Sequence, residues 1–211
     1  MERTTEHIFT LNTCTIARFV VNGLRENTYV LHDASGMGIV IDCGVRRETK
    51  ETRIANYITN NNIKPTLLLI THAHFDHLWG AQWFYDTFGI LPTIPPLEQD
   101  NYRNAEQNMH RILHRPLPLP LPANPLILDP TKNYGPLTCI ATPGHTHGSM
   151  CFYHKEEGVL FSGDTIFKNY IGLPKEEGIT LDQVQQTIQD KILTLPQGTL
   201  VLPGHGPEFY L

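Results

Sequence analysis

Hydrophobic and polar residues alternate along the first third of the chain in the manner of short β-strands. Ile8 to Val21 has this pattern, and so do Thr28–Leu31 and Gly38–Ile41, which flank a turn containing Ser35 and Gly36. Strand-like runs on either side of a glycine-containing turn are typical of a β-hairpin. We therefore expect the chain to begin with β structure.

A helix and a buried strand are predicted next. The segment from Glu51 to Asn61 places Ile54 and Ile58 four positions apart, on one face of a helix. Pro65 then introduces Thr66–Ile70, whose run of aliphatic residues is typical of a strand buried on both faces. The pattern thus changes from β to α and back to β.

The middle of the chain contains two more predicted helices, Leu78–Phe88 and Leu97–His114. The segment from Pro116 to Pro125 cannot be helical, because its alternating prolines lack backbone donors and restrict φ. We expect an extended, polyproline-like segment there, on the surface of the protein.

The last third repeats the order of strands followed by a helix. Its predicted strands are Leu137–Ala141, Met150–His154, Val159–Phe161 and Thr199–Leu202. A capping box at Thr180 opens a helix with one apolar face, made of Leu181, Val184, Ile188 and Ile192. Two stretches of strands followed by helices favour an α/β sandwich, in which helices cover the sheets. We expect residues 1–211 to form a single domain.

Composition narrows the class of protein. Of the 211 residues, 40% are hydrophobic and 18% are charged, and the formal net charge is −5. This balance excludes disordered and coiled-coil chains, and the mild acidity gives no electrostatic reason to bind nucleic acid. We therefore expect a small-molecule partner and no nucleic acid, and we leave the oligomeric state open.

The start of the chain and its longest aliphatic run bear on the compartment. The segment from Met1 to His7 is polar and lacks the apolar core of a secretory signal, and Leu67–Ile70 is far too short to span a bilayer. We expect a cytoplasmic protein that does not enter a membrane. Four cysteines form no CxxC pair and are expected to be buried, inert thiols: Cys14, Cys43, Cys139 and Cys151.

The chain has 11 histidines, and several of them stand in loops that follow predicted strands. The potential metal ligands of four such loops are His72, His74, Asp76 and His77, then His145 and His147, then Asp164, then His205. With this composition the HxHxDH pattern of the first loop arises by chance in roughly one chain in a thousand. Imidazole and carboxylate groups bind divalent cations, and turns at strand ends hold such ligands rigidly while leaving room for a substrate. We therefore predict a metal site. By contrast, His110 and His114 lack a third ligand nearby and are expected to be a surface pair.

These motifs resemble those of the metallo-β-lactamase-fold hydrolases and, within them, the glyoxalase II-like branch. The matching stretches are His72–His77, Thr142–Ser149, Phe161–Thr165 and Gly204–Gly206, and Asp42 matches an acidic residue that follows an early strand. The resemblance extends from about Asn27 to Pro207. It implies a four-layer αββα sandwich, with two mixed β-sheets and helices on the outer faces.

The same resemblance implies ligands for two divalent metal ions, zinc in the first place, with iron or manganese as alternatives. His72, His74 and His145 would hold one ion, Asp76, His77 and His205 would hold the other, and Asp164 would bridge both. Two ions about 3.5–4 Å apart lower the pKa of a bridging water toward about 7 and stabilise the oxyanion of an attacked carbonyl. The expected activity is metal-dependent hydrolysis of an ester-like bond, in which these residues are catalytic and Asp76 also orients the nucleophile.

Other residues are expected around this site. Asp42 is either an acceptor that orients a ligand histidine or a buried turn cap. The candidates for contact with the substrate are Phe75, Lys168, Tyr170 and His147, and a solvated loop is the alternative for Lys168 and Tyr170. Trp79 and Trp83 lie four positions apart on a predicted helix, a spacing more typical of core residues than of a pocket wall.

Two departures from the glyoxalase II pattern concern substrate recognition. Leu211 lies six residues after His205, without the C-terminal helical region that helps to hold glutathione in those enzymes. Leu173 stands where many relatives of this branch have arginine. These departures weaken the expectation of a glutathione thioester in particular. The resemblance still makes a thioester the first expected substrate and a lactone the second. The alternative to a hydrolase is an oxidoreductase of the persulfide dioxygenase type, which would use one iron on the same fold.

Overall fold

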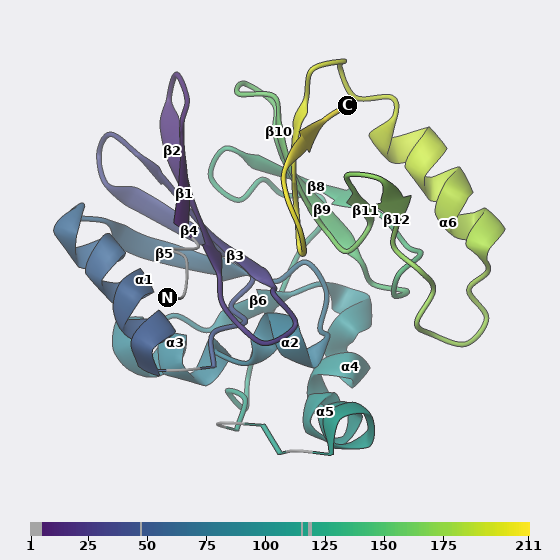
Figure 1. The fold of residues 1–211 in the computed structure, drawn as a ribbon, viewed down its shortest axis with the longest axis horizontal. Helices are drawn as coiled ribbons and strands as arrows, with labels where there is room; N and C mark the ends of the chain where they lie inside the picture. The colour runs from purple at the N-terminus through teal and green to yellow at the C-terminus, as the bar shows by residue number, and fades with distance from the viewer. Residues whose placement is uncertain (1–5, 47, 115, 118–119) are drawn as a thin grey trace.

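The computed structural model describes residues 6–46, 48–114, 116–117 and 120–211 and shows two facing β-sheets with helices outside them (Figure 1). The first sheet contains, in spatial order, β1 (Glu6–Thr10), β2 (Cys14–Val20), β3 (Asn27–Asp33), β4 (Met37–Ile41), β5 (Lys64–Leu69), β6 (Pro92–Ile94) and β7 (Leu126–Ile127). The second contains β14 (Phe209–Tyr210), β13 (Leu200–Pro203), β10 (Val159–Gly163), β9 (Met150–His154) and β8 (Leu137–Ala141). A small separate hairpin pairs β11 (Ile166–Phe167) with β12 (Tyr170–Ile171).

The helices follow the strands that they cover. In chain order they are α1 (Glu48–Asn60), α2 (Phe75–Leu78), α3 (Ala81–Phe88), the 3₁₀ turn η1 (Pro96–Glu98), α4 (Gln99–Arg103), α5 (Ala105–Leu113), α6 (Leu181–Thr187) and the π-helical turn η2 (Ile188–Ile192). The capping box at Thr180 is present, and its hydroxyl accepts a hydrogen bond from the backbone of Gln183. None of the helices formed by the described residues is long and apolar enough to cross a bilayer.

Three hydrophobic clusters hold the layers together. Ile54, Ile58 and Phe84 pack on the outer face of the first sheet, in the cluster that α1 and α3 cover. A second cluster lies between the two sheets, and its largest fully buried residues are Tyr29, Phe152, Phe161, Ile16, Ile41 and Leu69. The third packs α6 and η2 on the outer face of the second sheet through Val184, Ile188 and Ile192. The predicted four-layer αββα sandwich is therefore confirmed.

Several element boundaries differ from the prediction. Ile8 to Val21 is not one strand but a hairpin, because the chain turns at residues 11–13, where the Leu11 amide donates to the Cys14 carbonyl at 2.9 Å. The predicted helix Leu78–Phe88 starts earlier, as the short α2, and is broken before α3 where the Gly80 amide donates to the Cys43 carbonyl at 2.8 Å.

The predicted helix Leu97–His114 is also divided. It is broken at Asn104, whose φ of −96° and ψ of 6° end α4 and begin α5. Within the proline-rich segment, residues 118–119 lie outside the described residues, and residues 116–117 and 120–125 form neither helix nor strand. The predicted burial of the thiols is confirmed for Cys14, Cys43 and Cys151, whereas Cys139 is partly exposed, and all of these cysteines are free.

The strand directions bring the predicted ligand loops to one end of the sandwich. β4 and β5 are parallel, and so are β10 and β13. β8 runs in the same direction as β10, because both are antiparallel to β9. The loops that follow these strands meet at the end where Figure 1 shows α2, α4 and α5. Parallel strands whose carboxyl ends share an edge are a common scaffold for ligand sites.

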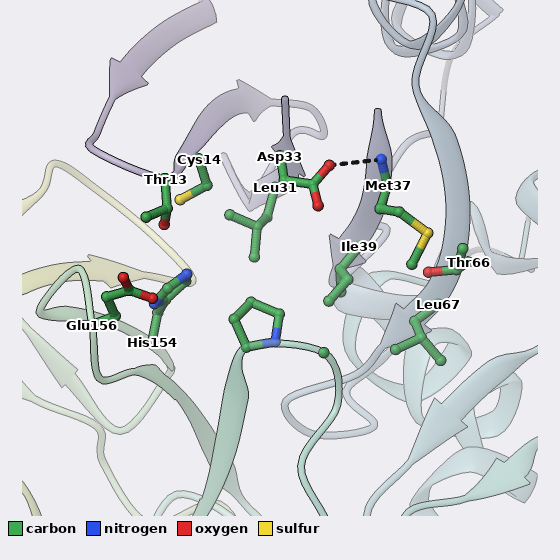
Figure 2. Close-up of a pocket in the computed structure, with 12 residues that line it drawn as sticks. Thr13, Cys14, Leu31, Asp33, Met37, Ile39, Thr66, Leu67, His154 and Glu156 are labelled. Carbon is green, nitrogen blue, oxygen red and sulfur yellow. Dashed lines mark hydrogen bonds between the residues drawn. The ribbon is translucent and has the colours of Figure 1, made fainter. Parts of the chain in front are cut away.

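A pocket of about 560 Å³ lies between the sheets at the opposite end of the sandwich (Figure 2). Its lining includes the start of β4 at Met37, the start of β2 at Cys14, and His154 at the end of β9. The Asp33 carboxylate on its rim accepts a hydrogen bond from the Met37 amide at 3.0 Å. None of the residues that the sequence predicts for the site lines this pocket.

Candidate metal centre

The loop after β5 is fastened by Asp42, which stands directly after β4. Asp42 has the left-handed φ of 56°, and its carboxylate accepts from the Thr71 amide and the Thr71 hydroxyl, each at 2.8 Å. This bidentate contact fixes the start of the loop. The chain is extended at His74, where ψ is 144°, and then winds into α2 from Phe75 onward. The HxHxDH motif is therefore half loop and half helical turn.

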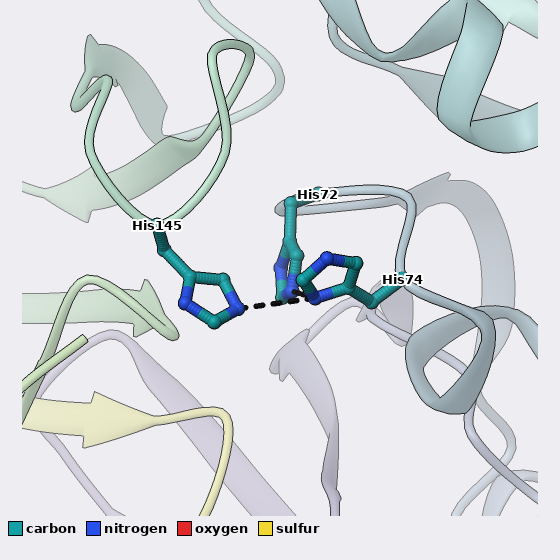
Figure 3. A group of neighbouring side chains, drawn as sticks. All are labelled: His72, His74 and His145. Carbon is teal, nitrogen blue, oxygen red and sulfur yellow. Dashed lines mark hydrogen bonds between the residues drawn. The ribbon is translucent and has the colours of Figure 1, made fainter. Parts of the chain in front are cut away.

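Three imidazole rings converge on one point at the end of the sandwich (Figure 3). Nδ1 of His74 lies 3.0 Å from Nε2 of His72 and 3.0 Å from Nε2 of His145. The second ring nitrogens of two of these histidines have other partners: His145 Nδ1 donates to the Leu173 carbonyl at 2.8 Å, and His72 Nδ1 lies 3.1 Å from the Thr71 hydroxyl. A hydrogen bond at one ring nitrogen leaves the lone pair of the other free to bind a cation.

A second group lies beside the first and contains a carboxylate. Nε2 of His205 lies 3.2 Å from an Asp76 carboxylate oxygen, and Nε2 of His77 lies 3.9 Å from the same oxygen. Here too the outer nitrogens are bound, because His77 Nδ1 donates to Asp42 at 2.8 Å and His205 Nδ1 donates to the Leu24 carbonyl at 3.0 Å. Asp42 therefore both fastens the loop and orients one of its histidines.

Asp164 lies between the two groups. One carboxylate oxygen is 3.5 Å from Nε2 of His77, and the other is 3.5 Å from Nε2 of His145 and 3.6 Å from Nε2 of His205. This close approach requires glycine in the neighbouring loop, since a Cβ at Gly204 would lie 2.3 Å from the Asp164 carboxylate. The loops after β10 and β13 thus meet directly at the centre.

The donor set fits divalent cations. Nε2 of His77 and Oδ1 of Asp164 are buried and have no hydrogen-bond partner among the described residues. A buried polar atom without a partner costs about 1–3 kcal/mol, so these atoms call for a ligand. Neutral imidazole and carboxylate groups suit zinc, iron and manganese alike.

Burial and neighbouring charge act differently on the two groups. Burial lowers the pKa of His74 and of His145 to about 4, and burial with the charge of His77 lowers the pKa of His72 well below its ordinary value. Burial also tends to lower the pKa of His77, but the surrounding carboxylates, first that of Asp42, raise it well above its ordinary value. These shifts favour the neutral form of the three imidazoles, the form in which histidine binds metals.

A cleft of about 400 Å³ opens onto both groups. Its lining comprises Leu24, His74, Phe75, Asp76, Asn101, Asn108, Arg111, Ile112, His145, Asp164, Lys175 and Glu176. Of the residues predicted to contact the substrate, Phe75 belongs to this lining, and it is 5% exposed.

The other three predicted substrate contacts lie outside the lining of the cleft. Lys168 and Tyr170 are exposed on the β11–β12 hairpin, where Tyr170 stacks on Phe167 at 4.5 Å between ring centroids. The side chain of His147 is 55% exposed, and its Nε2 lies 3.2 Å from the Glu177 carbonyl.

Sequence reasoning missed the residues that η1, α4 and α5 place near the metal centre and its cleft. Glu98 is fully buried against the histidine loops, and Asn101 and Arg111 lie on the cleft wall. No motif marks these positions. The available signal was a carboxylate inside the predicted helix Leu97–His114, next to the apolar Leu97, and it is too common to carry a prediction.

Comparisons with known proteins agree with this geometry. Residues 21–205 match the model of the metallo-beta-lactamase superfamily. The chain is 35% identical over 194 residues to "Probable metallo-hydrolase YqgX" of Bacillus subtilis, and the match covers 90% of both chains.

Two solved structures are similar in fold and in sequence. BLEG-1 B3 metallo-beta-lactamase superposes with a TM-score of 0.82 at 29% identity, over 92% of this chain and 93% of that one. TTHA1623 in a di-iron-bound form superposes with a TM-score of 0.80 at 26% identity, over the same shares of the two chains. Together with the family match, these likenesses support a metal-dependent hydrolase. The chain belongs to the metallo-beta-lactamase superfamily.

Proposed function

We propose that the protein is a dinuclear metal-dependent hydrolase that cleaves an ester-like bond, in the first place a thioester. The observation that carries this proposal is the pair of ligand groups that share Asp164. One of its oxygens lies 3.5 Å from His77, and the other lies 3.5 Å from His145 and 3.6 Å from His205. When bound, two divalent ions would supply a hydroxide nucleophile at neutral pH and polarise the carbonyl of the substrate.

The distances support the proposed ligand sets. His72, His74 and His145 would hold one ion, Asp76, His77 and His205 would hold the other, and Asp164 would serve both. Zinc remains the first expectation and manganese an alternative. Iron gains support because the similar protein TTHA1623 was solved in a di-iron-bound form.

The carboxylate of Asp76 has a second proposed role. One of its oxygens faces His205, and the side chain also lines the cleft. The other oxygen can accept a hydrogen bond from the attacking oxygen and orient it toward the carbonyl carbon. Orientation of the reacting groups lowers the entropic cost of the reaction.

The cleft wall favours a substrate that carries a negative charge away from the scissile bond. Arg111 and Lys175 line the cleft, and neither forms an ion pair with a carboxylate of the described residues. Glu176, the acidic neighbour of Lys175, is already bound to the Asn101 side chain and the His147 amide, each at 2.5 Å. Leu24 and Ile112 add apolar surface on the same wall.

The second ligand group also bears on the alternatives. A persulfide dioxygenase-type enzyme would use one iron, whereas Asp76, His77 and His205 form a further group with ligand atoms within 4.8 Å of one another. This completeness supports the dinuclear hydrolase. A lactone remains the second candidate substrate, because the same attack on a carbonyl opens it.

The test is a panel of thioesters and lactones, each in an anionic and a neutral form, assayed with the metal-loaded protein. We expect thioester hydrolysis that His77→Ala abolishes and that His110→Ala, an exposed substitution on α5, leaves unchanged. Oxygen consumption with a persulfide substrate, without hydrolysis of any ester in the panel, would contradict the proposal.

A further inference from the structure

Glu98 is a fully buried carboxylate that touches both histidine loops of the centre. Its Oε2 accepts a hydrogen bond from the amide of Ala73, which lies between His72 and His74, at 2.7 Å. Its Oε1 accepts from the Thr146 hydroxyl at 2.7 Å and from the Gly148 amide at 3.0 Å. We propose that Glu98 is a positioning residue that sets the distance between the two loops and thereby the affinity of the three-histidine group for its metal.

The chemistry of the contacts supports a positioning role. All the groups that approach the carboxylate are donors, and Glu98 forms no ion pair with any described residue. Burial of a carboxylate is costly unless hydrogen bonds compensate for the lost water, and these contacts supply them. An apolar residue at this position could fill the space, but it could not accept the hydrogen bonds that fix the position of the two loops relative to each other.

The contacts join parts of the molecule that come from different sheets. His72 and His74 follow β5 of the first sheet, whereas His145 follows β8 of the second. The imidazole contact between His74 and His145, at 3.0 Å, crosses from one sheet to the other. The side chain of Glu98 spans the same boundary, so its two oxygens control the distance that the metal ligands must keep.

Gly148 provides independent evidence of the close fit. A Cβ at this position would lie 2.5 Å from Oε1 of Glu98 and 2.7 Å from its Cγ, well inside van der Waals contact. Only glycine therefore lets the loop approach the carboxylate this closely. The need for glycine after His147 is explained by the contact with Glu98. It is not explained by a left-handed backbone, since φ of Gly148 is not positive.

The network continues to a third loop of the cleft. The Asn101 side chain donates to Glu98 at 3.0 Å and to Glu176 at 2.5 Å. Glu176 follows Leu173, whose carbonyl accepts the hydrogen bond from His145 Nδ1 at 2.8 Å. The side chains of Glu98 and Asn101, from η1 and α4, thus connect the loops that carry His72, His74 and His145 with the loop that contains Leu173 and Glu176.

The decisive variant is Glu98→Gln, which keeps the shape of the side chain. A glutamine amide offers one acceptor and one donor, so its NH₂ must face either the Ala73 amide or the Gly148 amide, donor against donor. We expect the affinity for zinc, measured by competition with a chelator, to fall about 10- to 100-fold. We also expect the rise in Tm that zinc produces to be smaller than in the wild-type protein.

The matched pair Thr146→Val and Thr146→Ser keeps the proposal testable if Glu98→Gln does not fold. Valine keeps the shape of threonine and removes the hydroxyl that donates to Glu98, whereas serine retains it. We expect Thr146→Val to weaken zinc binding and Thr146→Ser to bind zinc as the wild-type protein does. Equal zinc affinity in these two variants would overturn the proposal.

A merely structural role for Glu98 predicts another outcome. Glu98→Gln would then lower the Tm of the metal-free and zinc-loaded proteins by the same amount and leave the zinc affinity unchanged, and this result would also overturn the proposal. The inference rests on the metal-binding part of the proposed function. A zinc affinity that depends on Glu98, in a protein that hydrolyses no ester, would sustain the inference and reject the proposed hydrolase.

Discussion

The two ends of the sandwich are both crossed by a carboxylate that ties one sheet to the other, but in different surroundings. At the metal end, the fully buried Glu98 accepts from the Ala73 and Gly148 amides. At the opposite end, the partly exposed Glu157, in the turn between β9 and β10, accepts from the amides of Asn12 and Thr13 at 3.1 and 2.5 Å. The same kind of contact therefore occurs once in the protein interior and once at the protein surface.

The difference lies in what replaces each contact when it is lost. Water takes over the freed amides at the exposed end, so the β1–β2 turn loses little. At the metal end the groups are buried, so water cannot replace a lost hydrogen bond. Buried ligand atoms such as His77 Nε2 must also keep the orientation that metal binding requires. Substitutions at the buried end should therefore change function, whereas those at the exposed end should change stability slightly.

The largest effect is expected for Asp164→Asn. The substitution removes the negative charge that faces both ligand groups, at 3.5 Å from His77 and from His145. We expect kcat/KM for the best thioester to fall more than about a hundredfold. This exceeds the loss that is typical when a residue that only hydrogen-bonds to a metal ligand is replaced. Elemental analysis of the purified variant should show less metal per chain. Unchanged metal content and activity would remove Asp164 from the centre.

A smaller loss is expected for Asp42→Asn. The oxygen of the new amide can still accept from the Thr71 amide, but its NH₂ faces His77 Nδ1. In the wild-type protein this nitrogen donates to the Asp42 carboxylate at 2.8 Å, so the variant places donor against donor. We expect metal affinity to fall about 10- to 100-fold. Asp33→Asn is the matched control, because Asp33 is a hydrogen-bonded carboxylate at the other end of the molecule. Equal metal affinities in the two variants would show that Asp42 does not orient His77.

Next in size are the effects of removing charge from the cleft wall. Lys175→Ala and Arg111→Ala should each raise KM for an anionic thioester by up to about fivefold, because both side chains are exposed and solvent screens their charge. KM for a neutral analogue and kcat for both substrates should not change. Lys132→Ala, which removes an exposed lysine outside the cleft lining, is the control. An equal rise in KM for the neutral analogue would reject the proposed charge recognition.

The smallest effect is expected at the exposed end, for Glu157→Gln. Slight burial tends to raise the pKa of Glu157, but the hydrogen bonds from Thr13 and Asn12 lower it below its ordinary value of 4.5. A lowered pKa in the folded state contributes stability above pH 4.5, and this contribution is lost as the pH falls through the folded-state pKa. We expect a decrease in Tm of about 1–3 °C at pH 7 that disappears in acid, measured by circular dichroism. A decrease that persists in acid would contradict this reason.

The same contrast explains how much could be predicted from the sequence. The HxHxDH loop and its partners at His145, Asp164 and His205 follow strands with clear hydrophobic patterns, so their place at strand ends could be predicted. Asp42 could be placed after β4 for the same reason, although its contacts with Thr71 and His77 depend on the three-dimensional fold.

The elements that could not be predicted depend on contacts between distant parts of the chain. The turn between β1 and β2 is held in part by Glu157, about 145 residues away, and the local sequence offers only the short polar pair Asn12 and Thr13 as a turn signal. Glu98 accepts hydrogen bonds from Ala73 and Thr146, which are far from it in the sequence. Its role is visible only in the folded protein, where η1 contacts the loops that contain these two residues. The proposed substrate contacts are the least predictable part, since Arg111 lines the cleft from a helix that carries no motif.

Titration of the metal-free protein with a divalent ion tests the central claim most directly. Thioesterase activity and bound metal would be measured on the same samples, first with zinc and then with iron or manganese. The two ligand groups around Asp164 predict that binding saturates at two ions per chain and that activity requires the second. Saturation at one ion per chain, with full activity or with none, would contradict the dinuclear hydrolase.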